Sequence, residues 1–209
     1  MYIGTMYTHV FQEFTGKPIL VLDLDDVLRP TVASALAWYN KEFSTDYLVD
    51  QRMSAYSYRV VWGCTLEEEM ALVDRWYKEA SLEMLPILGA VEGLKELVKR
   101  YDVVIATSTD RSYADGVIDW IDRHFPNQIM QVCLLGYFHY EHDIRLTKGQ
   151  LAVDLNAKVA IDDLPYHIST YAALGVPAVL FGDFPWNTEV VLGPNVQRAL
   201  NWDQLITLI

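Results

Sequence analysis

Short apolar runs recur along the chain at intervals that suit the strands of an α/β protein. Residues 19–23, 103–107, 131–135, 158–162 and 178–181 are largely apolar, which is typical of strands buried on both faces. Stretches with helical spacing of apolar residues separate most of these runs. This alternation predicts an α/β fold with a doubly wound, Rossmann-like parallel sheet. The last stretch, residues 196–209, is predicted to form a closing helix.

A long segment after the first predicted strand breaks this alternation. Residues 31–43 have helical spacing, and the sequence TLEE at residues 65–68 matches a capping box that opens a further helix. We therefore predict a small helical cap over residues 31–85, inserted after the first strand. Residues 1–30 and 86–209 are predicted to form the core domain.

The predicted cap is rich in aromatic side chains, which have two interpretations. Most of them would form the hydrophobic core of the cap itself, whereas a few would line a pocket that faces the sheet. The residues concerned are Trp38, Tyr39, Tyr47, Tyr56, Tyr58, Trp62, Trp76 and Tyr77.

Composition fits a folded domain and narrows the choice of partners. The chain has 209 residues and is 52% hydrophobic, enough to bury a full core, which argues against disorder. Its formal net charge is −12, whereas a nucleic acid polymer is bound by a basic surface. A small anionic substrate is still allowed, because a metal ion or a local pair of basic residues can reverse the potential in one cleft.

Cysteine usage and hydropathy bear on the compartment. Cys64 and Cys133 are far apart and form no CxxC motif, so we interpret both as reduced packing residues. The sequence contains no apolar run long enough to span a membrane. Its first twenty residues lack the pattern of a signal peptide. We therefore expect a cytoplasmic protein without a membrane partner.

Acidic residues follow two of the predicted strands. In ILVLDLDDVLRP, Asp23 ends a strand and Asp25 lies two residues further on, and Asp162 and Asp163 end another strand in KVAIDDLP. Each could be an ordinary strand-end or helix-cap residue. In an open α/β sheet, however, ligands bind beyond the carboxyl ends of the strands, where these carboxylates would meet. Clustered carboxylates repel one another, and an all-oxygen set suits Mg²⁺, which in turn recruits phosphate.

Two further segments fit a phosphate site. Thr107 and Ser108 end the strand in VVIATSTD, and their hydroxyls could bind a phosphoryl oxygen. Lys148 precedes the strand that ends at Asp162 and could neutralise phosphate and carboxylate together. Taken alone, Thr107 would be a helix cap and Lys148 a solvated surface charge. Because they follow the two acidic motifs in this order, a functional role is favoured for both residues.

This set of motifs resembles the haloacid dehalogenase superfamily of phosphatases. The matching residues are DLDDVL, the ATS that ends at Ser108, Lys148 and IDD, with a cap at the superfamily's usual first insertion point. The details are most similar to the 5′(3′)-deoxyribonucleotidase group, the cytosolic type C 5′-nucleotidases, which remove phosphate from nucleoside monophosphates. Thr109 departs from that group, which often has proline there, and Arg111 stands where a phosphate-contacting lysine can occur.

The resemblance implies a role for each site residue. Asp23 would attack phosphorus to form an aspartyl-phosphate, and Asp25 would serve as the general acid and then as the general base. The implied Mg²⁺ ligands are Asp23, Asp25 through its backbone carbonyl, Asp162 and Asp163. The implied phosphate-binding residues are Thr107, Ser108, Arg111 and Lys148. A homodimer is compatible with the group.

Two alternatives stay open at this point. The protein could act on a sugar phosphate or another small phosphomonoester. It could also be a homologue that has lost turnover and binds a phosphorylated ligand. The sequence HYEHD at residues 139–143 lacks the spacing of a zinc-protease motif and is interpreted as a polar loop.

Overall fold

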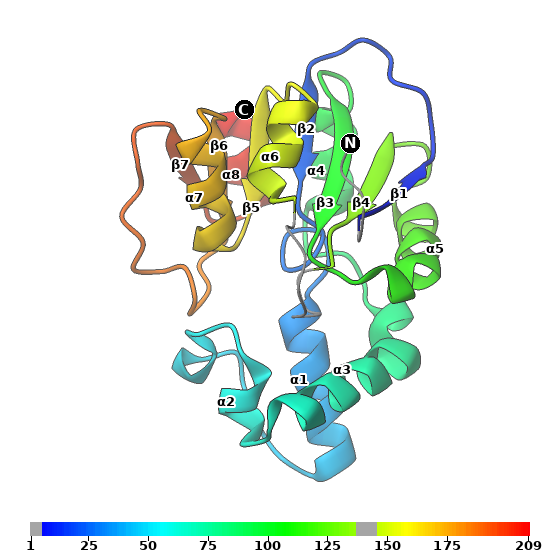
Figure 1. Cartoon of the computed structure of the whole chain (residues 1–209), viewed down its shortest axis with the longest axis vertical. Helices are drawn as coiled ribbons and strands as arrows, with labels where there is room; N and C mark the ends of the chain where they lie inside the picture. The colour runs from blue at the N-terminus through cyan, green and yellow to red at the C-terminus, as the bar shows by residue number, and fades with distance from the viewer. Residues whose placement is uncertain (1–5, 137–145) are drawn as a thin grey trace.

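The computed structural model describes residues 6–136 and 146–209. In this part of the chain a seven-stranded sheet has the order β1-β4-β3-β2-β5-β6-β7 (Figure 1). All neighbouring strands are parallel except β1, which is antiparallel to β4. The strands are β1 (Tyr7–Val10), β2 (Ile19–Leu22), β3 (Asp102–Thr107), β4 (Gln131–Leu134), β5 (Val159–Asp162), β6 (Ala178–Phe181) and β7 (Val196–Ala199). The predicted α/β fold is confirmed.

Helices cover both faces of the sheet, and the side chains of β2 show why its sequence is apolar throughout. Leu20 and Leu22 pack in one cluster with α4 (Ala90–Leu97), α5 (Ala114–His124) and α8 (Trp202–Leu208). Val21 points to the other face, which is covered by α6 (Lys148–Asp154) and α7 (Pro165–Ala173). Because water reaches neither face of β2, a continuous apolar run is stable there.

The prediction of one closing helix over residues 196–209 is wrong in its first part. The structure has strand β7 there, which pairs in parallel with β6, and the helix α8 begins only at Trp202. The side chain of Asn201 accepts a hydrogen bond from the backbone N–H of Gln204 (3.0 Å) and so caps this helix. The strand is short and contains polar residues, so its pairing partner rather than its own pattern determines its conformation. Strand β1 likewise forms at the sheet edge, against β4.

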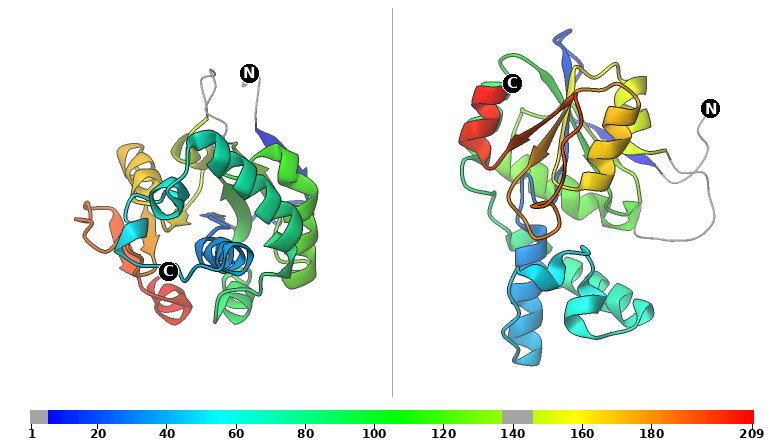
Figure 2. Two further views of the ribbon diagram at one scale, coloured as in Figure 1. Left: turned by 90° about the horizontal axis from the view of Figure 1, so that it is seen from below. Right: turned by 90° about the vertical axis from the view of Figure 1, so that its left-hand side faces the viewer.

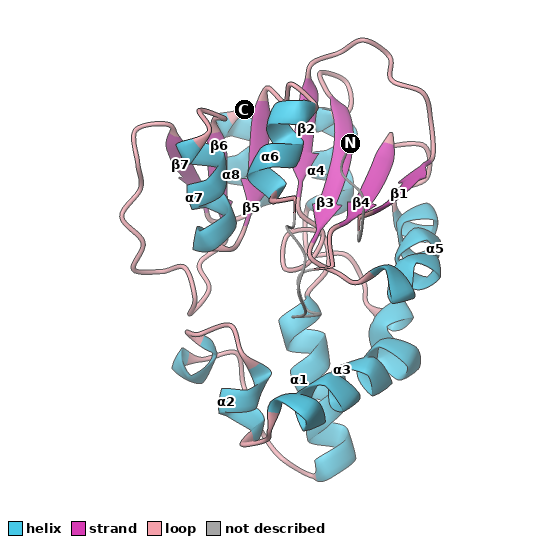
Figure 3. Ribbon diagram, in the orientation of Figure 1, coloured by secondary structure: helices cyan, strands magenta, loops and turns pink. Residues whose placement is uncertain are grey.

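Between β2 and α4 the chain forms helices only. They are α1 (Thr31–Phe43), η1 (Gln51–Met53), α2 (Tyr58–Trp62), α3 (Leu66–Ala80) and η2 (Ser81–Glu83). The capping box forms as predicted, because Thr65 and Glu68 each accept a hydrogen bond from the other's backbone N–H. Figure 2 and Figure 3 show these helices as a separate layer beyond the end of the sheet from which α1 departs. We call this helical layer, from α1 to η2, the cap. That residues 31–85 form a domain separate from the core stays a prediction.

Two further expectations concern membrane-spanning helices and the loop at residues 139–143. Across residues 6–136 and 146–209, no helix has the length and apolar character that a membrane span requires. The polar loop expected at residues 139–143 lies outside the described residues.

Candidate active site

Three buried carboxylates meet where β2 and β5 end side by side. These two strands pair in parallel. Asp23 directly follows β2, while Asp162 is the last residue of β5 and Asp163 follows it. Asp23, Asp162 and Asp163 each place a carboxylate oxygen within 4.8 Å of the others, and their exposed fractions are 3%, 0% and 1%. The structure thus brings the two acidic motifs together.

Lys148 is the cation within this cluster. It begins α6 and is completely buried. Its Nζ lies 2.8 Å from Oδ1 of Asp23 and 2.9 Å from Oδ2 of Asp162. Burial alone would lower the pKa of Lys148, but Asp162 and Asp23 outweigh burial and raise that pKa above its ordinary value. The ammonium group therefore stays charged at neutral pH.

The cluster still holds more negative than positive charge. Burial raises the pKa of Asp23 and Asp163 well above the ordinary carboxyl value, and the neighbouring carboxylates raise it further. Among the described residues, Oδ1 of buried Asp163 has no hydrogen-bond partner. An all-oxygen set with such an orphaned acceptor fits Mg²⁺, because this ion takes oxygen ligands and would remove the repulsion.

Asp25 lies beside the cluster and is held by many donors. Its Oδ1 accepts hydrogen bonds from Nε of Arg29 (2.9 Å) and from the hydroxyl of Thr31 (2.5 Å). Its Oδ2 accepts from the hydroxyls of Thr107 (2.9 Å) and Thr109 (3.1 Å). Burial would raise the pKa of Asp25, but Arg29, Thr31 and Thr107 together hold it below its ordinary value. The carboxylate is therefore ionised and fixed in one orientation.

Asp26 connects this loop to the first cap helix. It has a left-handed backbone, with φ of 56°, and its Oδ1 accepts from the N–H of Val32 (3.2 Å). The hydroxyl of Tyr56 donates to Oδ2 of Asp26 (3.3 Å). Burial, together with the charge of Asp25, raises the pKa of Asp26 to about 8. The acidic stretch therefore places its third aspartate in a structural position.

The residues predicted to bind phosphate lie in different environments. Thr107 ends β3 with its hydroxyl committed to Asp25. Ser108 lines the pocket described below, and its Oγ lies 3.1 Å from Nε2 of His167. Arg111 is exposed on η3 (Arg111–Tyr113) and does not line that pocket. The structure thus brings Thr107, Ser108 and Lys148 to the site but not Arg111.

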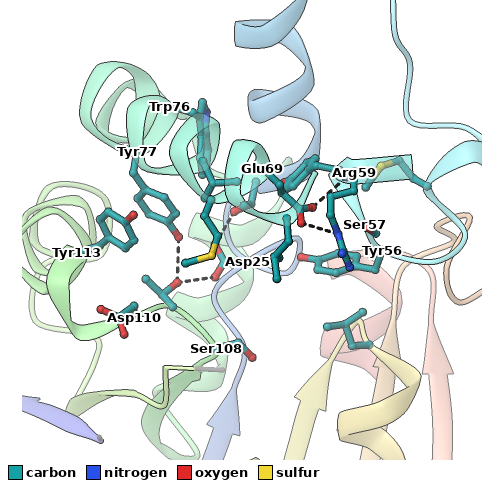
Figure 4. A pocket seen from close by; sticks show the side chains of 18 of the residues that line it. Asp25, Tyr56, Ser57, Arg59, Glu69, Trp76, Tyr77, Ser108, Asp110 and Tyr113 are labelled. Atoms are coloured by element: carbon teal, nitrogen blue, oxygen red, sulfur yellow. Dashed lines mark hydrogen bonds and ion pairs between the residues drawn. The ribbon is translucent and has the colours of Figure 1, made fainter. Parts of the chain in front are cut away.

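A pocket of about 230 Å³ lies between the acidic loops and the cap (Figure 4). On one side the ring of Tyr77 stacks on that of Tyr113, with centroids 4.1 Å apart. On the other side Arg59 forms an ion pair with Glu69 (3.0 Å). The other lining residues include Asp23, Asp25, Met53, Tyr56, Tyr58, Met70, Val73, Trp76, Ser108, Thr109 and Leu164. The pocket therefore joins the carboxylates to a largely aromatic enclosure.

Both interpretations of the cap aromatics are correct for part of the set. The pocket is lined by Tyr56, Tyr58, Trp76 and Tyr77. The remaining four, Trp38, Tyr39, Tyr47 and Trp62, pack within the cap clusters instead. The ring of Tyr58 connects the two groups, since it stacks on Trp62 at 4.6 Å.

Sequence reasoning missed several residues that hold the site. Arg29 and Thr31 bind Asp25, and the only signal for Arg29 was a charged residue inside an apolar stretch. Trp186 and Asn187 both bind Asp163, through its side chain and its backbone carbonyl. They belong to the sequence FPWN at residues 184–187, whose proline and aromatic residues gave no sign of this contact.

Comparison with known protein families identifies the family of the chain. Residues 17–209 match the model of the family described as 5′ nucleotidase, deoxy (Pyrimidine), cytosolic type C protein. The chain belongs to this family. The resemblance inferred from the motifs is therefore confirmed, and this type C 5′-nucleotidase family member is a phosphoric monoester hydrolase. No curated protein sequence matches the chain.

Solved structures with similar folds include hydrolases described as haloacid dehalogenase-like. A haloacid dehalogenase-like hydrolase from Streptococcus pneumoniae has a TM-score of 0.62 and 14% identity, covering 93% of this chain and 99% of that one. CbbY from Rhodobacter sphaeroides, in complex with phosphate, has a TM-score of 0.59 and 11% identity, with 90% and 96% covered. D,D-heptose 1.7-bisphosphate phosphatase from B. bronchiseptica, with magnesium and phosphate, has a TM-score of 0.55 and 10% identity, with 91% and 96% covered. The type C family member thus shares their fold.

Proposed function

We propose that this protein is a Mg²⁺-dependent 5′(3′)-nucleotidase that removes phosphate from nucleoside monophosphates through an aspartyl-phosphate on Asp23. The main support is the meeting of Asp23, Asp162 and Asp163, with Lys148 beside them and an aromatic pocket next to them. One oxygen of Asp163 has no hydrogen-bond partner among the described residues. The family match supports the nucleotide substrate.

Asp23 is suited to act as the nucleophile. Its Oδ1 accepts hydrogen bonds from the N–H of Leu24 (2.7 Å) and faces Lys148, which orients the carboxylate. Oδ2 makes no hydrogen bond in the described part of the chain and is the attacking atom in our proposal. Its attack forms the bond from Asp23 to phosphorus while the bond from phosphorus to the leaving oxygen breaks. Water then hydrolyses the aspartyl-phosphate.

Asp25 is proposed to move the protons. It would protonate the leaving oxygen and afterwards take a proton from the attacking water. Arg29 and the threonine hydroxyls keep it ionised in the free protein. A phosphate dianion that binds nearby raises the pKa of a carboxyl group, because like charges favour its neutral form. Substrate binding would therefore supply the protonated form that the first step needs.

Mg²⁺ would be held by carboxylate oxygens of Asp23, Asp162 and Asp163 and by the backbone carbonyl of Asp25. When bound, the ion would offset negative charge on the phosphoryl group. Magnesium in a solved relative with this fold is consistent with such a site. Lys148 and Ser108 are proposed to bind phosphoryl oxygens. Thr107 would join them by turning its hydroxyl from Asp25 to the phosphate.

The aromatic pocket is proposed to hold the nucleoside. Tyr77 already stacks on Tyr113, and Tyr58 stacks on Trp62, so these rings form ordered walls. Stacking of a base on such a ring contributes about 1–3 kcal/mol in single-strand binding proteins. We further propose that the protein acts in the cytoplasm, in line with the family's description as cytosolic.

The Asp23→Asn variant tests the mechanism. We expect phosphate release from an aryl phosphate to fall below detection in Mg²⁺, because an amide does not attack phosphorus, while the circular dichroism spectrum stays unchanged. Asp119→Asn, on the exposed surface of α5, is the matched control and should keep wild-type activity. EDTA should abolish phosphate release by the wild type, and added Mg²⁺ should restore it. Turnover retained in Asp23→Asn would remove Asp23 as the nucleophile.

A substrate panel tests the specificity. Rates of phosphate release should be measured in Mg²⁺ for ribo- and deoxyribonucleoside 5′- and 3′-monophosphates and for sugar phosphates. We expect the highest kcat/KM for a nucleoside monophosphate. A preference for sugar phosphates would contradict the proposed substrate, and hydrolysis of none would contradict the whole proposal.

A further inference from the structure

Trp186 contacts one of the three carboxylates of the proposed cation site. Its indole Nε1 donates a hydrogen bond of 2.7 Å to Oδ2 of Asp163, and both residues are buried. The other oxygen, Oδ1, has no partner among the described residues. We propose that Trp186 is a positioning residue of the divalent-cation site, which holds Oδ2 so that Oδ1 is presented to the ion. This inference rests on the proposed function.

The loop that carries Trp186 has little freedom to move. The Asn187 side-chain amide donates to the backbone carbonyls of Asp163 and Phe181, both at 2.9 Å. Its oxygen accepts from the N–H of Phe184 (3.0 Å). Gly182 has φ of 84°, and a Cβ there would lie 2.2 Å from the ring of Phe184. The position of the indole is therefore set by backbone hydrogen bonds as well as by its own packing.

Ring contacts hold the plane of the indole. Phe184 stacks on Trp186 with centroids 4.7 Å apart and planes 9° apart. Tyr56, from the cap, approaches edge-on at 5.0 Å and 75°. Tyr56 also lines the pocket and donates to Asp26. Trp186 thus contacts a pocket wall on one side and a proposed cation ligand on the other.

The chemistry explains why an indole suits this position. Residues behind a metal ligand fix its orientation, and their loss typically lowers metal affinity or activity about 10- to 100-fold. The indole N–H donates but accepts nothing, so it can bind only one oxygen of Asp163 and cannot compete with the carboxylate for a cation. Without this donor, the carboxylate could rotate and turn both oxygens away from Asp23 and Asp162.

Two substitutions at Trp186 separate the hydrogen bond from the packing. Trp186→Phe keeps an aromatic ring but removes the donor. Trp186→His places an N–H at the ring position that Nε1 occupies, within a smaller ring. Mg²⁺ binding to the full chain, without substrate, should be measured by isothermal titration calorimetry. We expect the Kd of Trp186→Phe to rise about 10- to 100-fold and that of Trp186→His to stay within a few-fold of wild type.

A matched control is available in the cap. The indole of Trp38 also donates to a carboxylate, Glu79 (2.9 Å), away from the acidic cluster. Trp38→Phe should bind Mg²⁺ like the wild type. In activity assays, Trp186→Phe should need more Mg²⁺ for half-maximal rate but should recover most of its kcat when Mg²⁺ is saturating.

The outcomes distinguish this inference from the proposed function. Wild-type Mg²⁺ affinity in Trp186→Phe, with a wild type that hydrolyses nucleotides, would overturn only the role of Trp186. Equal loss in the phenylalanine and histidine variants would assign the effect to packing and would also overturn it. A wild type that neither binds Mg²⁺ nor releases phosphate would overturn both proposals.

Discussion

Arg29 lies inside the protein with 1% of its surface exposed, and its charge is balanced within a short loop. Its guanidinium binds Asp25 through Nε and Nη2, both at 2.9 Å, and also lies over the rings of Tyr77 and Trp120. Removing one partner of a buried ion pair leaves the other charge uncompensated, which costs more than the pair itself contributes. This residue therefore stabilises the loop only while Asp25 is ionised.

We predict that Arg29→Met lowers the free energy of unfolding by about 3–5 kcal/mol, because it leaves the Asp25 carboxylate buried without its cation. The double variant Arg29→Met/Asp25→Asn should lose less than the sum of the two single losses. Urea unfolding of the wild type and the three variants measures this coupling. Strictly additive losses would show that the two side chains do not stabilise each other.

At the scale of a single element, helix α7 carries a buried ionisable side chain. Its His167 is 3% exposed, and Nε2 lies 3.1 Å from Oγ of Ser108 in the loop after β3. Burial, reinforced by the charge of Lys148, lowers the pKa of His167 to about 4. In the unfolded chain the pKa is about 6.5. The unfolded state therefore binds more protons between these values, and stability falls as the pH drops from about 6.5 to about 4.

We predict that His167→Gln reduces the pH dependence of stability. Between pH 7 and pH 5, proton binding to His167 in the unfolded state should lower the free energy of unfolding of the wild type by about 2 kcal/mol. Glutamine avoids this loss because it does not titrate, and it can still bind Ser108. The free energy of unfolding in urea should be measured at both pH values in EDTA. An identical loss in the variant and the wild type would mean that other groups cause the dependence.

The whole molecule places its acidic cluster between the sheet and the cap, where burial makes the repulsion costly. Asp23 and Asp163 both have pKa values raised by burial and by neighbouring carboxylates. A cation that binds only the folded state stabilises it, by about 2.7 kcal/mol at a concentration of 100 times its Kd. Without the ion, the clustered carboxylates that the proposed reaction needs therefore destabilise the folded state.

We predict that Asp163→Asn raises the Tm in EDTA and abolishes the rise in Tm that Mg²⁺ causes in the wild type. The amide removes one negative charge, while its oxygen still accepts from Trp186. Thermal unfolding in EDTA and in Mg²⁺ measures both effects. Asp119→Asn on exposed α5 should respond to Mg²⁺ like the wild type. A wild-type Tm that ignores Mg²⁺ would contradict the cation site.

Elements whose sequence pattern is set locally could be predicted, whereas an element that depends on a distant partner could not. Apolar runs predicted strands such as β2 and β3 because burial on both faces removes polar residues from every position. TLEE predicted the start of α3 because a capping box is satisfied within four residues. Neither inference needed a distant partner. The pattern failed at β7, where pairing with β6 decides the conformation.

By itself, the sequence determined the fold class and the carboxylates that would meet, because strand ends in a parallel sheet share one edge. Only the tertiary structure decided which side chains hold those carboxylates. Thr109 reaches Asp25 across 84 positions of the chain, and Trp186 reaches Asp163 across 23. The tertiary structure also decided which aromatic residues of the cap line the pocket. Such contacts join residues with no common periodicity, so their pairing exists only once the chain has folded.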